Sequence, residues 1–362
     1  MKTPPVDFLL SCPVPIPPGS AVLLGHGSGG KLTNDLIRSL FVPLFTADDD
    51  GGGPGELARL GDSAVVEIDG TRLAFTTDGF VVTPKEFPGS DIGALSVYGT
   101  VNDLAMMGAR PLFLSAALIL EEGFPMEELT RIVTSMAEAC RASGVRLVTG
   151  DTKVVERGSA DGLFITTSGI GAVPGGGDVG PELAAVGDAV IVSGPVGSHG
   201  VTVMSRRAGV EFDTQLTSDS APLTDLVTAM LGAGDVHCLR DATRGGIASA
   251  LNEIADASGA GMTIDERAVP VLPAVKGACE MLGLDPFYVA NEGVCVAIVA
   301  GSDAEAIVAA ARAHPLGARA AVVGMVNPPD EHPGISRVHV RSGLGGTRPL
   351  LMLAGEQLPR IC

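Results

Sequence analysis

The sequence predicts an α/β protein built from two domains, and three observations support this expectation. The chain has 362 residues, which is more than one typical domain of about 100–200 residues. Apolar runs of strand length alternate along it with stretches of helical periodicity. A proline- and glycine-rich break, VPGGGDVGPELAAVGD at 173–188, separates two such alternating halves. We therefore expect an N-terminal domain over 25–175 and a C-terminal domain over 185–332.

The N-terminal half is expected to begin with an extended arm, because residues 1–24 are rich in proline, which supports neither helix nor sheet ladder. AVLLG at 21–25 predicts a strand that leads through HGSGGK into a helix over 32–40, and TADDDGGGPGE at 46–56 predicts a flexible acidic loop. Five further strands and two helices follow: AVVEI, RLAFTT, LFLSAALIL, VRLVTG and LFITTSGIG, with helices from about Ile92 and about Glu127.

The C-terminal half repeats the alternation. It is expected to contain the strands AVIVSGPVG, VCVAIV and AAVVGMV and helices near 222–232, 245–257 and 303–313. Beyond about 333 the core periodicity fades. We expect 333–362 to be a flexible tail that ends on Cys362.

Composition excludes several classes of protein. Hydrophobic residues make up 46% and charged residues 18%, which is typical of a folded chain and not of a disordered one. No apolar run is long enough to span a membrane. The net charge of −18 repels nucleic acid and anionic lipid, so we expect neither as a partner. A small anionic ligand is still compatible with this charge if a metal ion bridges it to carboxylates.

The six cysteines do not predict a metal cluster or a disulfide framework, because none of them forms a C-x-x-C pair. LLSC at 9–12 follows too few apolar residues to be an export signal, which needs roughly 7–15. We expect a cytoplasmic protein with reduced thiols.

The glycine loop GHGSGGK at 25–31 matches the P-loop pattern only superficially. Leu32 stands where a P-loop has the Ser or Thr that holds magnesium, and Thr33 points elsewhere on a helix. A mobile glycine loop is the favoured interpretation.

Aspartates recur where strands end or glycine turns begin. The motifs GDS, TTDGF, VND, GDT and RDATRGG contain Asp62, Asp78, Asp103, Asp151 and Asp241. A single such aspartate is commonly just a turn cap. Five of them without matching lysines favour a site for a hard cation. Asp103 supports this most strongly, because helical spacing places it on one face with Ile92, Ser96 and Gly99.

Three further residues are candidates for chemistry. Arg244 precedes a glycine pair that opens an amphipathic helix, a setting that suits an anion. Glu292 precedes a buried strand, and Lys153 lies two residues after Asp151. Each of them could equally be a member of an ion pair. The histidines form no nucleophile–histidine–acid arrangement that would indicate a hydrolase.

The ordered motifs GDSA, TTDGFVV, GTVNDLAMMGA, GDTKVV, RDATRGG and NEG resemble those of the superfamily that includes aminoimidazole ribonucleotide synthetase, selenophosphate synthetase and thiamine monophosphate kinase. The ending GTRPLLMLAGEQLPRIC narrows the resemblance to the HypE family of hydrogenase maturation factors, which are ATP-dependent carbamoyl dehydratases. The resemblance runs from about Gly25 to Cys362. The proline-rich arm and the 46–56 segment depart from the pattern.

This resemblance implies two α/β domains with mixed sheets covered by helices, an aminoimidazole ribonucleotide synthetase-like fold, with dimers formed through the N-terminal domains. It implies ATP and Mg²⁺ at the domain and dimer interface. It also implies a carbamoyltransferase partner, HypF, that loads Cys362, and a HypC–HypD scaffold that receives the cyanide. The positions that the resemblance implies for nucleotide and metal binding are Asp62, Asp78, Asp103 and Asp151, with Asn102 beside them. Asp241 and Arg244 of the RDATRGG motif are further candidates for nucleotide contacts.

The chemistry of the implied reaction is simple to state. A carbamoyl group on Cys362 loses water once its oxygen is phosphorylated and a base removes the nitrogen protons. Glu292 is the first candidate for that base, and Lys153 for charge stabilisation. Two alternatives stay open: a superfamily kinase or synthetase acting on a free small molecule, such as a selenophosphate synthetase, and a nucleotide-regulated binding module. The selenophosphate branch would place a reactive cysteine in the glycine loop, and HGSGGK has none.

Overall fold

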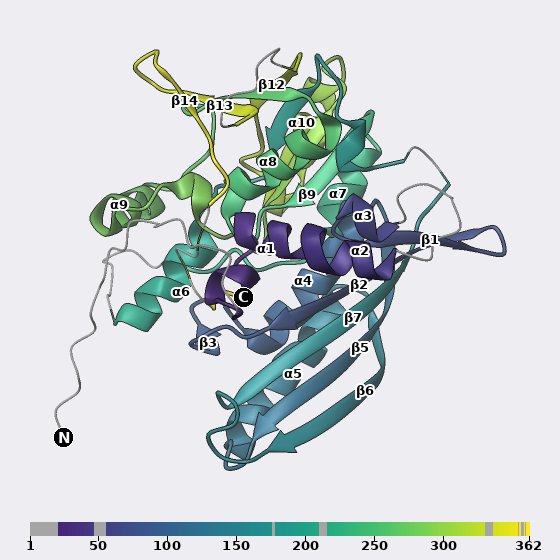
Figure 1. Ribbon diagram of the computed structural model, residues 1–362, viewed down its shortest axis with the longest axis vertical. Helices are drawn as coiled ribbons and strands as arrows, with labels where there is room; N and C mark the ends of the chain where they lie inside the picture. Colours follow the sequence, from purple (N-terminus) through teal and green to yellow (C-terminus); the bar gives the residue numbers. More distant parts are fainter. Residues whose placement is uncertain are drawn as a thin grey trace.

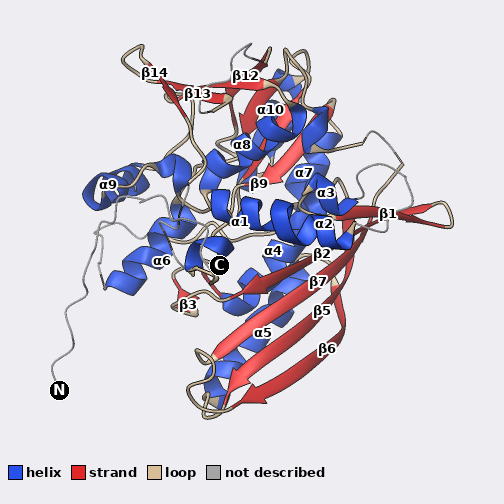
Figure 2. Cartoon of the chain, viewed as in Figure 1, coloured by secondary structure: helices blue, strands red, loops and turns tan. Residues whose placement is uncertain are grey.

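The structure is a computed structural model that describes residues 21–46, 56–175, 178–209, 216–329, 336–353, 355, 358 and 360–362. The expected proline-rich arm up to residue 20 and most of the 46–56 loop lie outside the described residues. Two α/β units lie one above the other, each a mixed sheet covered by helices (Figures 1 and 2). The fold class predicted from the sequence is confirmed.

The first unit is a five-stranded sheet in the order β1-β2-β7-β5-β6, antiparallel except for the β5–β6 pair. Helices α4 and α5 cover one face, toward which β2 directs Ala74, Thr76 and Phe80. No helix among the described residues covers the other face. The elements are β1 (Ala64–Ile68), β2 (Thr71–Phe80), β5 (Arg110–Glu121), β6 (Arg146–Val155), β7 (Leu163–Ala172), α4 (Ile92–Met106) and α5 (Met126–Ala142), with the short pair β3 (Glu86–Phe87) and β4 (Ser90–Asp91).

Helix α4 belongs to both units. It begins at an Asp91 cap, whose side chain accepts a hydrogen bond from the Ala94 amide, and it is buried on nearly all sides. Its last residues, Ala105 and Met106, pack into the hydrophobic core of the second unit. A polar residue near the end of α4 therefore lies at the junction of the two units.

The second unit is a seven-stranded sheet in the order β14-β13-β10-β12-β8-β11-β9, in which β10 and β13 run parallel. Helix α8 packs on one face, and α7 and α10 pack on the other. Its elements are β8 (Ala189–Val192), α6 (Ser198–Ala208), α7 (Thr224–Leu231), β9 (Val236–Asp241), α8 (Gly246–Ser258), β10 (Gly261–Asp265), α9 (Pro273–Leu282), β11 (Cys295–Val299), α10 (Ala304–Ala313), β12 (Ala321–Asn327), β13 (Val338–Arg341) and β14 (Thr347–Pro349), with short helices η3 (Pro181–Leu183), η4 (Pro286–Tyr288) and η5 (Pro315–Gly317).

Two sequence predictions differ from the structure at the chain ends. No strand forms over 21–25; a short helix η1 (Leu24–Gly27) precedes a helical run of α1 (Lys31–Leu36), η2 (Ile37–Phe41) and α2 (Val42–Phe45), with α3 (Glu56–Arg59) after it. The expected tail from 333 is partly sheet, since β13 and β14 complete the second unit. Val338 and Val340 are fully buried there, but two alternating valines are too short a signal to predict a strand.

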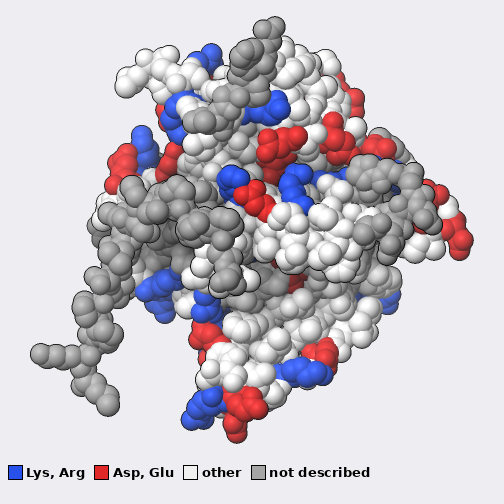
Figure 3. All heavy atoms as spheres, viewed as in Figure 1, with Lys and Arg blue, Asp and Glu red and all other residues white. Residues whose placement is uncertain are grey.

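The described surface carries positively and negatively charged side chains among uncharged ones (Figure 3). Over β5, β6 and β7, few charged side chains are visible in Figure 3. In the described part of the chain no helix has the length and apolar character needed to cross a membrane.

Candidate active site

A cavity of about 220 Å³ lies where the two units meet, and the last residue of the chain is part of its lining. The C-terminus lies between the two units in Figure 1. Strand β2 and helix α4 form the wall from the first unit, and the end of β9, the start of α8 and the loop before β11 form the opposite wall. Most of the residues singled out from the sequence line this cavity: Asp62, Asp78, Asp103, Asp241, Arg244, Glu292 and Cys362. Asn102, Asp151 and Lys153 do not line it.

Close packing between α4 and β2 brings the aspartates together. Gly99 and Asp103 lie one helical turn apart on the face of α4 that meets β2, as their spacing predicts. A Cβ on Gly99 would lie 2.8 Å from the Phe80 ring and 3.4 Å from Asp78 Oδ2, so the approach requires glycine. The Thr76 hydroxyl donates to Asp103 Oδ2 over 2.8 Å.

Burial raises the pKa of every aspartate in the cavity. The pKa of Asp62 is raised to about 6, although Arg240 opposes the shift. The pKa values of Asp103 and Asp241 are raised well above the ordinary range by burial, and repulsion from neighbouring carboxylates adds to the effect. Burial also raises the pKa of Asp78 against the influence of Arg244. Charging this cluster is costly, so a cation would be bound favourably.

The oxygen donors of the cavity fit a hard divalent cation. Asp62 Oδ2 and Glu292 Oε1 are buried and lack a hydrogen-bond partner. Across the described ranges, however, no three acidic, histidine or cysteine side chains converge closely enough to hold an ion. A Mg²⁺ ion here would need further ligands, such as phosphate oxygens and water.

Two arginines balance part of this charge. Arg240 forms ion pairs with Asp62 over 3.2 Å and with Glu253 over 2.6 Å. Its charge is therefore already balanced within the protein. Arg244 donates to the Gly27 carbonyl over 2.7 Å and lies 3.8 Å from Asp78. Arg244 therefore remains available to a negatively charged group in the cavity.

The glycine loop before α1 covers this arginine. Gly29 has a φ of +71°, and a Cβ there would lie 2.8 Å from the Cβ of Arg244. Lys31 pairs with Asp35 on the surface over 2.7 Å, so it does not act as a P-loop lysine in this conformation. The Lys31 amide donates to the Leu353 carbonyl, which joins the loop to the C-terminal segment.

Glu292 is held by its backbone while its carboxyl faces the cavity. Its amide donates to Asp219 Oδ1 over 3.2 Å, and its carbonyl accepts from Asn102 Nδ2 over 3.1 Å. Burial raises the pKa of Glu292 well above its usual range, and Asp241 adds to the shift. A buried carboxyl of raised pKa is suited to proton transfer.

Asn102, which was predicted beside the nucleotide and metal positions, does not line the cavity. Its Nδ2 donates to the carbonyls of Ala221 and Glu292, and its Oδ1 accepts from the Leu223 amide over 2.8 Å. All of its hydrogen-bonding groups are thus used inside the protein. Its place beside Asp103 on α4 made it a plausible ligand, but a helix directs adjacent residues to different sides.

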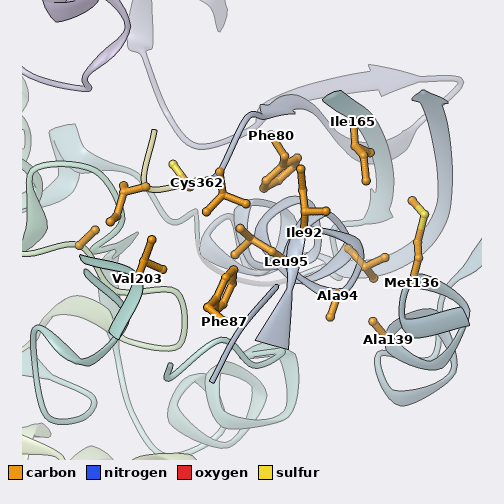
Figure 4. Packing of buried hydrophobic residues seen from close by; sticks show 14 of the residues in the cluster. Phe80, Phe87, Ile92, Ala94, Leu95, Met136, Ala139, Ile165, Val203 and Cys362 are labelled. Atoms are coloured by element: carbon orange, nitrogen blue, oxygen red, sulfur yellow. The ribbon is translucent and has the colours of Figure 1, made fainter. Parts of the chain in front are cut away.

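Cys362 is buried at the edge of a hydrophobic cluster that includes Phe80 and Phe87 (Figure 4). Only 9% of its surface is exposed, and burial raises its thiol pKa to about 12 despite the nearby Arg244. The expectation of a flexible end therefore differs from the structure at 360–362, where the chain is docked. The docked thiol is protonated and is a poor nucleophile.

Asp151 and Lys153 lie on the edge strand β6, away from the cavity. Their side chains are exposed and pair with each other over 2.7 Å. In the pairing of β6 with β5, Asp151 lies beside Ala117 and Lys153 beside Ile119. Both side chains are on the sheet face that no described helix covers. A single protomer does not bring them to the other candidates.

Sequence reasoning missed Arg240 and Glu253, which line the cavity, and His199 and Asp219, which lie next to Glu292. Arg240 was detectable, since it opens the RDATRGG motif. His199 and Asp219 carry no local signal, because each acts on a segment far away in sequence.

Comparisons with known proteins match both units of the chain. Residues 60–173 match the family described as AIR synthase related protein, N-terminal domain, and 185–334 match the corresponding C-terminal domain. A carbamoyl dehydratase HypE from Cupriavidus necator is 52% identical over 94% of this chain and 94% of its own length. A HypE structure in complex with ATP is 46% identical, covering 94% of this chain and 100% of its own, with a TM-score of 0.78. A chain of a HypE–HypF complex structure is 43% identical, covering 88% of this chain and 99% of its own, with a TM-score of 0.79.

Proposed function

Because the chain belongs to the HypE family of AIR synthase related proteins, we propose that it is an ATP-dependent carbamoyl dehydratase of hydrogenase maturation. The observation that carries this proposal is the position of Cys362, which lies in the acidic cavity together with Glu292 and Arg244. Its product would be a thiocyanate on Cys362, the source of a cyanide ligand for the hydrogenase iron.

The proposed reaction acts on a carbamoyl group carried by the Cys362 sulfur. The carbamoyl oxygen attacks the γ-phosphorus of ATP, ADP leaves, and the nitrogen loses one proton. The C–O bond then breaks, phosphate leaves with the oxygen, and loss of the second nitrogen proton gives S–C≡N. Glu292 is the proposed base, since its Oε1 is buried, has no hydrogen-bond partner and lies on the cavity wall.

We propose that the cavity aspartates hold the ATP phosphates through Mg²⁺. Asp62, Asp78 and Asp103 are the proposed magnesium ligands, and Asp241 and Arg244 are proposed nucleotide contacts. Mg²⁺ would neutralise phosphate charge during the transfer. The absence of three converging ligands among the described residues is compatible with this, because Mg²⁺ usually takes one or two carboxylates together with phosphates and water.

We further propose a homodimer formed through the uncovered face of the first sheet. That face exposes Val66, Phe75 and Ile170, and contiguous apolar surface of this kind is typical of an interface. Asp151 and Lys153 lie on the same face. They remain predicted site residues, which would act toward the partner protomer's nucleotide and not their own.

The proposed partners are a HypF carbamoyltransferase, which loads Cys362, and a HypC–HypD scaffold, which receives the cyanide. Loading requires the tail to leave the cavity, because the docked thiol has a pKa of about 12 and is buried. The described cysteines are all free thiols, which fits the proposed cytoplasmic location.

The test is mass spectrometry of the intact protein after incubation with the carbamoyltransferase, carbamoyl phosphate and ATP. We expect a carbamoyl adduct on Cys362 that loses one water when ATP is hydrolysed. Glu292→Gln should accumulate the carbamoyl adduct without losing water, because the amide cannot accept the proton. An unmodified Cys362 in the wild type would overturn the function, and normal water loss by the Gln variant would overturn only the assignment of Glu292.

A further inference from the structure

The last three residues are held by main-chain hydrogen bonds from both units. The Arg360 carbonyl accepts from the Thr83 amide over 3.2 Å and from Arg207, and a main-chain carboxylate oxygen of Cys362 accepts from the Val81 amide over 3.1 Å. Val81 and Thr83 lie on the segment that follows β2, whereas Arg207 lies on α6. The carbonyl between these two acceptors, that of Ile361, points the other way and accepts from His199 Nε2 over 2.8 Å.

His199 lies in the first turn of α6 and is fully buried. Its Nδ1 lies 2.8 Å from the Ser218 hydroxyl, and the Ser220 amide donates to that hydroxyl oxygen. The edge of the Phe87 ring meets the imidazole at a centroid distance of 5.3 Å. Contacts from three separate segments thus fix the ring in place.

This network also fixes which nitrogen carries the proton. A carbonyl oxygen can only accept, so Nε2 must donate to Ile361. Burial lowers the pKa of His199 to about 4, so the ring is neutral and Nδ1 accepts from the Ser218 hydroxyl. The Glu292 carboxyl lies 3.9 Å from Nε2 and faces the same segment.

The direction of the Ile361 carbonyl decides the direction of the neighbouring side chains. Arg360 turns the chain with a φ of +54°. The main-chain oxygens of Ile361 and Cys362 point to opposite sides, since one accepts from His199 and the other from Val81, and successive side chains on such a backbone also point to opposite sides. With the Ile361 carbonyl on His199, the Ile361 side chain packs in the core and the Cys362 side chain enters the cavity. A slip of one residue would turn the thiol away from Glu292.

We propose that His199 is a positioning residue, a neutral Nε2–H donor that fixes the register of the 360–362 segment and so directs the Cys362 sulfur into the cavity. Its relevance to turnover rests on the proposed function. The docking itself does not, and can be measured without any reaction.

A merely structural histidine would stabilise the fold without controlling the exposure of Cys362. The test therefore measures the alkylation rate of Cys362 by iodoacetamide, followed by mass spectrometry of the C-terminal peptide. His199→Leu removes the donor and His199→Gln can retain one. Thr202→Val is the matched control, since Thr202 is equally buried on α6 and has no hydrogen bond to the tail.

We expect roughly tenfold faster alkylation for His199→Leu, the effect of losing one hydrogen bond, and near wild-type rates for His199→Gln and Thr202→Val. Wild-type protection of Cys362 in a folded His199→Leu protein would overturn the proposal. If that variant does not fold, Ser218→Ala decides: faster alkylation supports the proposal, and an unchanged rate overturns it.

A single-turnover measurement on carbamoylated protein completes the test. The water-loss rate should fall in His199→Leu and recover in His199→Gln. An unchanged rate despite an exposed thiol would overturn the positioning role. If wild-type protein forms no thiocyanate, the proposed function fails while the alkylation result still decides the docking.

Discussion

Truncating Phe75 to alanine should weaken the proposed homodimer on the order of a thousandfold. Phe75 is 48% exposed on the uncovered face of the first sheet, where Ala64 and Ile170 flank it in register. A phenylalanine side chain has about 200 Å² of surface, so at 48% exposure about 100 Å² of Phe75 can be covered by the partner. At about 25 cal/mol per Å² this is about 2.5 kcal/mol per protomer, and a twofold interface counts it twice.

About 5 kcal/mol corresponds to more than three decades in Kd, and ordering costs at the interface reduce the observed effect. Sedimentation velocity over a dilution series measures the dissociation directly. Phe45→Ala is the matched control, because Phe45 is 78% exposed on α2 and lies outside the sheet. Equal dissociation of wild type and Phe75→Ala, or equal weakening by Phe45→Ala, would refute the reasoning.

Two further predictions concern the charge of the cavity. Asp103→Asn should raise the melting temperature of the ligand-free protein, because it removes one of several mutually repelling buried carboxylates. The same substitution should reduce the increase in melting temperature that Mg²⁺ and ATP produce. A lower melting temperature of the ligand-free variant would contradict this prediction. The pKa of Asp62 is raised from 3.8 to about 6 in the folded protein, so its contribution to stability is complete below 3.8 and is lost as pH rises through 6. With a chelator present, the midpoint of urea unfolding should therefore be higher at about pH 5 than at about pH 7.5, and Asp62→Asn should reduce that difference; an equal difference in the variant would argue against this origin.

The sequence by itself determined the α/β alternation and most of the cavity. Strands such as AVVEI and LFITTSGIG are rich in β-branched residues, and their positions agree with β1 and β7. The aspartates could be predicted because their types and turn settings are local. The spacing of Gly99 and Asp103 even indicated the correct face of α4.

Tertiary structure alone decided how these parts meet. The side-chain amide of Asn102 has the donor and acceptor atoms of a ligand-binding group. In the structure these atoms form hydrogen bonds with three backbone groups from two distant loops. Lys153 matches the family motif, yet its strand lies at a sheet edge remote from the cavity. Strands β13 and β14 exist because the second sheet offers them an edge, a cause that is absent from their own residues.

The same division applies to Cys362. The sequence by itself shows that the last residue carries a thiol, and it contains the motifs from which a reactive role for this thiol was predicted. Its docking depends on donors from Val81, Thr83 and His199, which lie far from it in the chain. Local patterns report residue types and periodicity, whereas the register of a docked segment is set by long-range hydrogen bonds from both units.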